Sequence, residues 1–288
     1  MTQDLAAPDS QHLLLADVVK HIKELPTLPL VAQDLLSNLD DDNISLDEIS
    51  EKVARDQSLA AGVLRAANSS FYGSNSKVVT IQQAVSMLGI RRVKNLIRLT
   101  AISNSFPPSR CRNFDFQAFW SHSIATAECA ELISRTLHMK HDFAFTAGLL
   151  HDIGRLVLVT RFPAQYEQVI LHRQQEDCYL LQAEQAVMGI DHVVAGLALA
   201  DQWQFSEAIH DAIRGHHDPE IEGLNSVASI VHIANAVVHG LDLSHIEDDL
   251  VPLISETAWN TVRLDKSDYL RIFRETEMRL DAINGIIL

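Results

Sequence analysis

The most apolar run in the chain is FAFTAGLLHDIGRLVLVT, from Phe143 to Thr160. Its spacing of apolar residues predicts one helix over Asp142–Leu158. His151, Asp152 and Arg155 interrupt the apolar residues, so we do not expect the run to cross a membrane. Burying an imidazole beside a carboxylate is costly unless a partner satisfies both groups. A divalent cation is one such partner, and a hydrogen bond that joins two helices is the alternative.

Helical spacing extends over most of the 288 residues, which include only 11 glycines and 8 prolines. So few helix breakers favour long helices over a turn-rich β architecture or disorder. The predicted fold class is all-α. Ser45 and Glu48 match a capping box that opens one helix, and Asp218-Pro219 should end the helix carrying His216 and His217. Further helical patterns cover Phe116–Leu137, Ala164–Glu176, Leu181–Trp203, Glu207–His217, Asn225–Val238 and Asp268–Ile283.

The formal net charge of −15 disfavours broad binding to nucleic acids and to anionic membranes, because both partners are negatively charged. The three cysteines are scattered, which argues against a disulfide framework and against a thiolate zinc site. The first residues do not have the pattern of a signal peptide. We therefore expect a cytoplasmic protein.

Histidines are concentrated in the second half of the chain, where twelve of the 14 lie between His122 and His245. A single histidine in an apolar helix is more often a satisfied core or surface residue. Several on successive helices can converge, as they do in metal sites of helical bundles. His122, His192 and the His216-His217 pair join His151-Asp152 in this pattern. Mixed nitrogen and oxygen donors favour Fe, Mn, Zn or Ni over Ca.

A family resemblance rests on these residues together with motifs in the first half. His122, His151-Asp152, His216-His217 and Ala234-Asn235 resemble the ordered motifs of the HD phosphohydrolase superfamily, and His192 is similar to an extra histidine of its HD-GYP branch. The N-terminal half resembles the HDOD family over about residues 17 to 240. The matching stretches are Leu25-Pro-Thr-Leu-Pro29, Arg55–Ser69 and Gln83–Gly89.

The resemblance implies a helical-bundle N-terminal subdomain packed on an HD-like helical core. Under this interpretation, residues 1–16 form a tail and residues 17–108 form the HDOD helical subdomain. Residues 109–245 form the metal-site subdomain, and residues 246–288 form a C-terminal helical extension.

The resemblance also implies a metal site with one or two divalent transition metal ions. Asp152 would bridge the ions, and Asn235 stands where the superfamily has an aspartate, which binds a cation more strongly. Asp152 and Arg155 would be the catalytic residues of an active enzyme, with Arg155 on the phosphate; a surface ion pair is the alternative for Arg155. The implied metal ligands are His122, His151, Asp152, His192, His216, His217 and Asn235.

Two functions follow from the resemblance. The first is a regulatory protein of signal transduction whose HD-type site holds a divalent metal; Asn235 and the missing GYP tripeptide favour it. The second is a metal-dependent phosphohydrolase that acts on a nucleotide or a cyclic dinucleotide, which the nearly complete histidine set favours. The expected partner is a signalling protein or a small nucleotide ligand, with no DNA and no membrane.

Two further groups of residues have open interpretations. Arg91, Arg92, Lys94 and Arg98 form either a docking spot for an anionic ligand or a solvated helix face balanced by acidic neighbours. His232 and His239 flank Asn235 at helical spacing, and either shelter the pocket or are satisfied residues.

Overall fold

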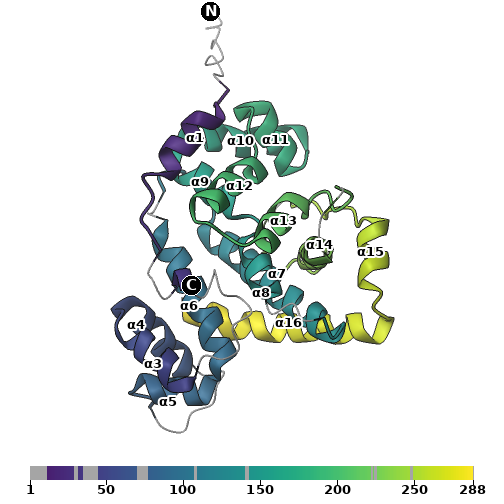
Figure 1. Ribbon diagram of the computed structural model, residues 1–288. Helices are drawn as coiled ribbons and strands as arrows, with labels where there is room; N and C mark the ends of the chain where they lie inside the picture. The colour runs from purple at the N-terminus through teal and green to yellow at the C-terminus, as the bar shows by residue number, and fades with distance from the viewer. Residues whose placement is uncertain are drawn as a thin grey trace, which may run out of the picture. The chain divides into compact units, whose positions relative to one another are not determined.

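The computed structural model describes residues 12–28, 32–34, 45–69, 77–106, 109–139, 143–221, 223, 226–246 and 249–287. Helices account for all the regular secondary structure in these ranges, and no strand occurs in them (Figure 1). The predicted all-α fold class is confirmed.

Contacts divide the chain into two compact units. Unit 1 consists of Met1–Leu25, Pro107–Phe114 and Asp152–Trp203, and unit 2 consists of Pro26–Phe106, Asp115–His151 and Gln204–Leu288. Each unit therefore combines stretches that are far apart in sequence. The subdomain boundaries inferred from the resemblance stay a prediction.

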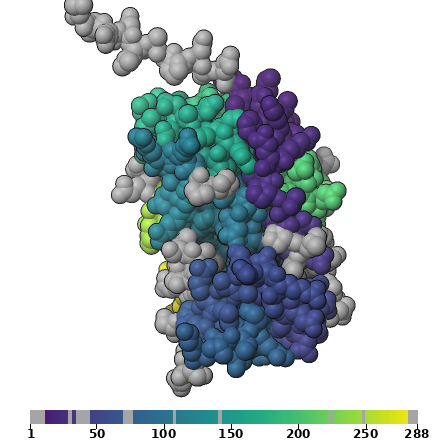
Figure 2. Space-filling view, turned by 90° about the vertical axis from the view of Figure 1, so that its left-hand side faces the viewer, coloured from purple at the N-terminus to yellow at the C-terminus, as the bar shows by residue number. Residues whose placement is uncertain are grey.

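Unit 2 contains two groups of helices. Helices α3 to α6 pack together and form a continuous blue surface in Figure 2. Among them, α6 contacts α8 and α4 contacts α16, while α7 packs against α8, α14 and α16. The bounds are α3 Leu46–Ala54, α4 Gln57–Ala67, α5 Ile81–Leu88, α6 Ile90–Ser105, α7 Phe116–Thr136, α8 Ala144–Leu150, α13 Glu207–Gly215, α14 Ser226–Gly240, α15 Glu256–Val262 and α16 Lys266–Ile287.

Unit 1 is built from five helices among its described residues. Helix α9 packs against α12 and α1, and α10 packs against α11. The bounds are α1 Leu15–Ile22, α9 Ile153–Arg161, α10 Pro163–Glu176, α11 Leu180–Met188 and α12 His192–Gln202.

Local signals in the sequence set several of these helix ends. Ser45 caps α3 as predicted, because its Oγ accepts a hydrogen bond of 3.1 Å from the Glu48 amide. The predicted helix Leu181–Trp203 is wrong as a single element. Gly189 ends α11 in the left-handed region at φ +70°, and Asp191 caps the start of α12.

Helix α7 forms the centre of unit 2, since 16 of its 21 residues are buried. A helix buried on nearly all sides belongs to the core rather than to the surface. His122 lies on this helix, so its imidazole is fixed by the packing around it. None of the described helices is both long enough and apolar enough to cross a membrane.

Candidate functional site

The His151-Asp152 dipeptide lies between two helices, so the single helix predicted over Asp142–Leu158 is wrong. His151 Nδ1 lies 2.7 Å from the carbonyl oxygen of Gly148, and this bond competes for the oxygen that the Asp152 amide would use in a continued helix. The boundary between the units also falls here, with His151 in unit 2 and Asp152 in unit 1.

Two glycines flank the dipeptide and permit backbone contact between helices. A Cβ atom on Gly148 would lie 2.8 Å from the Cα of Ala127 on α7. A Cβ atom on Gly154 would overlap the carbonyl oxygen of His192 and lie 2.5 Å from the amide nitrogen of Gly196, both on α12. The glycines thus allow α8 to approach α7, and α9 to approach α12, more closely than any side chain would.

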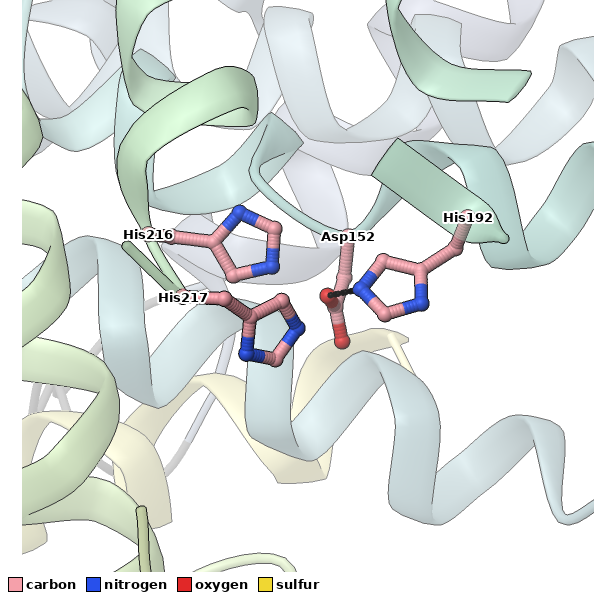
Figure 3. A group of neighbouring side chains, drawn as sticks. All are labelled: Asp152, His192, His216 and His217. Carbon is pink, nitrogen blue, oxygen red and sulfur yellow. Dashed lines mark ion pairs between the residues drawn. The ribbon is translucent and has the colours of Figure 1, made fainter. Parts of the chain in front are cut away.

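Four of the predicted metal ligands come together within unit 2. The Nε2 atoms of His122 and His151 are 3.3 Å apart, and the ring centroids of His151 and His216 are 5.0 Å apart. His217 follows with its ring centroid 4.1 Å from that of His216, and Figure 3 shows the two rings side by side. His122, His151 and His216 are buried, whereas His217 is exposed. α13 ends at Gly215, so the predicted helix stops just before the histidine pair.

Hydrogen bonds to backbone carbonyls fix which ring nitrogen of these histidines carries the proton. His151 Nδ1 bonds to Gly148 O, and His216 Nδ1 bonds to Ile213 O at 2.8 Å. A carbonyl only accepts, so both Nδ1 atoms donate, and the lone pair of each ring is on Nε2. Metal-binding histidines use the same arrangement. Two nitrogens that bind one ion tetrahedrally at about 2.1 Å are about 3.4 Å apart, close to the spacing of His122 and His151.

Helix α14 adds a stripe of three polar side chains at spacings of three and four residues. His232 is a satisfied residue, because its Nδ1 donates to His216 O at 2.7 Å and its Nε2 accepts from the Ser255 amide at 3.0 Å. His239 places its ring centroid 4.6 Å from that of His122 and forms an ion pair with Asp249 at 2.6 Å. Between them Asn235 is buried, and its Oδ1 has no hydrogen-bond partner among the described residues. A buried oxygen of this kind fits a cation ligand.

The remaining predicted residues belong to a buried polar network in unit 1. Asp152 Oδ1 lies 3.4 Å from His192 Nε2, the contact dashed in Figure 3. Asp152 Oδ2 accepts a hydrogen bond of 2.9 Å from Arg155. The alternative for Arg155 was an ion pair at the surface. Arg155 does form an ion pair, with Asp152, but the pair is buried.

Glu184 holds His192 in this network, a role that was not predicted. Its Oε2 accepts from the His192 amide at 2.8 Å and from His192 Nδ1 at 2.5 Å, and its Oε1 accepts from the Tyr166 hydroxyl at 3.0 Å. The Nδ1 bond directs the Nε2 atom of His192 toward Asp152. An acidic residue eight positions before His192 in an apolar helix was the available signal.

Charge and burial have opposite effects on the pKa of His192, and burial and the charge of Glu184 have the same effect on the pKa of Tyr166. Burial disfavours the imidazolium form of His192, but the negative charges of Glu184 and Asp152 outweigh it and raise its pKa. Burial and the adjacent Glu184 raise the pKa of Tyr166 well above its usual value. Tyr166 is therefore a neutral donor to Glu184 at every physiological pH.

The basic cluster of α6 does not form one solvated face. Lys94 and Arg98 are buried, and Arg98 donates to Asn95 at 3.1 Å. Arg91 is half exposed and lies 3.5 Å from Glu131 of α7. The interpretation as a solvated face is therefore wrong for the two buried residues.

The helical fold and its buried histidines and carboxylates define an all-α protein with a candidate metal-binding site. The family model named HDOD domain matches residues 25–219, and the chain belongs to this family.

Known proteins similar to the chain extend this comparison. An uncharacterized protein of Treponema pallidum (strain Nichols) is 22% identical over 273 residues; the match covers 93% of this chain but only 50% of the relative, so the chain spans about half its length. An HDOD domain protein of unknown function from Geobacter sulfurreducens has 25% identity and a TM-score of 0.78, covering 95% of this chain and 98% of that one. A "Putative phosphohydrolase" from Shewanella amazonensis SB2B has 25% identity and a TM-score of 0.72 with the same coverage.

Proposed function

We propose that this HDOD protein is a regulatory protein of signal transduction whose HD-type site binds a divalent transition metal, one of Fe, Mn, Zn or Ni. The observation that carries the proposal is the contact of His151 Nδ1 and His216 Nδ1 with backbone carbonyl oxygens, at 2.7 and 2.8 Å, which leaves Nε2 of each ring to bind a metal. The proposed ligands are His122, His151, Asp152, His192, His216, His217 and Asn235.

The covalent structure supports treating these ligands as one set. His151 ends the group of histidines in unit 2, and Asp152 begins the polar network in unit 1. Consecutive Cα atoms are about 3.8 Å apart, so the last histidine of one group and the carboxylate that begins the other belong to neighbouring residues of the chain. Asn235 supplies a neutral oxygen where a carboxylate would bind more strongly, which favours one well-bound ion over two.

The bound metal would supply a positive charge that attracts a phosphate group and offsets its developing negative charge. The chain's own residues position the ligands. Glu184 orients His192, and Arg155 holds one oxygen of Asp152 through a hydrogen bond of 2.9 Å. Because Arg155 is hydrogen-bonded to Asp152, it is less available to contact a substrate phosphate. This favours a site for binding and signalling over one for rapid catalytic turnover. We propose a separate signalling protein or a small nucleotide as the partner, and no DNA or membrane.

Metal analysis of protein purified without chelators tests the proposal. We expect about one equivalent of a transition metal in the wild type and a loss of most of it in Asp152→Ala. Asp201→Ala is the matched control, since it removes an exposed carboxylate of the same unit. A wild-type protein that holds no transition metal, and takes up none of the four metals on reconstitution, would contradict the proposal.

Hydrolysis of a phosphodiester is the second candidate, favoured by the similarity to the Shewanella amazonensis protein. The metal-loaded wild type and Asp152→Ala are assayed on bis(p-nitrophenyl) phosphate and on cyclic dinucleotides. Turnover that disappears in the variant supports a phosphohydrolase. Equal inactivity of the two proteins, with metal bound only to the wild type, supports the regulatory function.

A further inference from the structure

A second candidate binding site lies in unit 2, in a groove between the C-terminal end of α7 and helix α16. We call it the α7–α16 groove; it has a volume of about 430 Å³, within the range of small-molecule sites. Its floor includes the buried side chains of Leu132 and Ile272. Its charged and polar lining consists of three arginines, two carboxylates, a threonine and a histidine: Arg135, Arg271, Arg279, Asp268, Glu275, Thr136 and His138.

Two of the arginines present hydrogen-bond donors to this groove. Arg271 donates through Nη2, to Thr136 Oγ1 at 3.2 Å and to Asp268 Oδ1 at 3.0 Å. Arg135 lies 3.8 Å from Glu131, which is too far for a hydrogen bond. Both side chains are about half exposed, at 55% for Arg135 and 54% for Arg271.

The third arginine is held by acidic residues and shapes the wall. Arg279 donates to Glu128 at 2.9 Å and to Glu275 at 3.4 Å. Its charge is therefore balanced within the protein. Arg135 and Arg271 each lie beside one carboxylate, Glu131 at 3.8 Å and Asp268 at 3.0 Å, and their half-exposed guanidinium groups have further donors for a ligand. Asp268 contacts the guanidinium group of Arg271 through its Nη2 atom.

His138 contributes an unusual backbone conformation at the edge of the groove. Its φ of +51° lies in the left-handed region, where a glycine would be less strained. The histidine at this helix terminus places an imidazole in the lining of the groove. The polar lining of the groove thus combines three guanidinium groups, a hydroxyl and an imidazole with two carboxylates.

We propose that the α7–α16 groove binds a small phosphorylated molecule, with its phosphate between Arg135 and Arg271. A phosphate group offers three or more acceptor oxygens to planar guanidinium donors, whereas a carboxylate offers two. The apolar floor accommodates the organic part of the ligand. A site for an anion is unexpected in a chain with a net charge of −15, and it is separate from the proposed metal ligands.

Calorimetric titration of the full chain with pyrophosphate tests the proposal, in the presence of a chelator so that no metal takes part. We expect binding by the wild type and at least a tenfold increase in Kd for Arg135→Ala/Arg271→Ala, about 1.4 kcal/mol. Lys266→Ala/Arg274→Ala removes the same charge from exposed positions of α16 outside the groove and should bind as the wild type does. Arg135→Lys/Arg271→Lys keeps the charge but not the planar donors, and should bind with intermediate affinity.

Three outcomes would overturn the proposal: no binding of millimolar pyrophosphate to the wild type, equal loss of binding in the control variant, or citrate binding more tightly than pyrophosphate. Titration of Asp152→Ala separates this site from the metal site. That variant should lose metal and retain pyrophosphate binding. If pyrophosphate binding disappears with Asp152, the anion occupies the metal site and not the groove.

Discussion

The amide oxygen of Asn235 is buried among histidines and has no hydrogen-bond partner within the described residues. Asn235→Asp changes the charge without changing the shape. We expect at least tenfold tighter metal binding, since a carboxylate is the stronger ligand. Without metal, the uncompensated charge should lower the free energy of unfolding by about 1–3 kcal/mol. Urea unfolding with chelator and with Mn²⁺ measures both effects, and a variant that is equally stable in both conditions would contradict a role at a cation.

Glu184 is the residue on which the orientation of His192 depends. Glu184→Gln keeps the volume but replaces the charged oxygen that accepts from His192 Nδ1 and from the His192 amide with a neutral amide oxygen, which is the weaker acceptor. Losing such a partner behind a metal ligand typically weakens metal binding by 10–100-fold, and we expect a loss in this range. Competition with a chromogenic chelator gives the affinity. Glu167→Gln is the control, because it removes a carboxylate of the same unit that bonds only to the Arg112 amide among the described residues.

At the scale of helices, the contact between α9 and α12 depends on the absence of a side chain at Gly154. The neighbouring atoms of a Cβ there belong to the backbone of α12 and cannot rotate away. Gly154→Ala should therefore lower the free energy of unfolding by about 3 kcal/mol. Gly62→Ala is the matched comparison, since its Cβ would meet only the Thr100 hydroxyl at 2.9 Å, a side chain that can move. Urea unfolding should show Gly62→Ala within about 1 kcal/mol of the wild type; similar losses in both variants would refute the argument.

The pairing of α7 with α16 should make stability depend on pH through Glu128. Burial, and then the nearby charge of Glu131, raise the pKa of Glu128, while Arg279 lowers it. A carboxyl whose pKa is raised by folding stabilises the protein fully below its unfolded pKa of about 4.5, and that contribution is lost as the pH rises through its native pKa. Arg279→Met removes the cation and raises the native pKa further. We expect a loss of about 3 kcal/mol at pH 8 and a smaller loss at pH 5.

Thermal or urea unfolding of the wild type and of Arg279→Met at both pH values measures this difference. Glu128→Gln/Arg279→Met should remove most of the pH dependence, because the buried charge is absent. A loss in Arg279→Met that is the same at pH 5 and pH 8 would mean that Glu128 does not carry the effect.

The sequence predicted most helices but not the breaks inside two of them. Helix α7 was predicted to within one residue, because its apolar pattern is long and a turn precedes it. The break at Gly189 had a local signal, since glycine favours the left-handed conformation found there. The break at His151-Asp152 had no such local signal, because neither residue has a backbone preference that ends a helix. It depends on a tertiary environment that buries the His151 ring against the Gly148 carbonyl.

The candidate site was predictable in its residue types and not in its supporting contacts. The motif spacing identified His122, His151 and His216, which the structure brings together in unit 2. It did not identify Glu184 or the contact of His239 with His122, because these depend on how the helices pack. Spacing along one helix placed His239 on the same face as Asn235, but the ring that it contacts belongs to α7.

At the scale of the whole molecule, the chain passes between the two units five times. Neither unit is therefore a continuous segment that can be expressed alone, and tests of the site need the full chain. If the proposed ligands bind one ion, the metal stabilises both units together. Ligand binding at a hundredfold excess over Kd adds about 2.7 kcal/mol to the free energy of unfolding.

Tryptophan fluorescence can follow each unit separately, because Trp203 belongs to unit 1 and Trp120 to unit 2. Trp120→Phe/Trp259→Phe leaves a reporter in unit 1, and Trp203→Phe/Trp259→Phe leaves one in unit 2. With metal, the two reporters should show the same urea midpoint, raised relative to the chelated protein. The shift should vanish for both in an Asp152→Ala background, where the ligand at the junction of the units is missing. A metal that raises the midpoint of only one reporter would mean that its ligands belong to one unit, and the set of seven ligands would have to be divided.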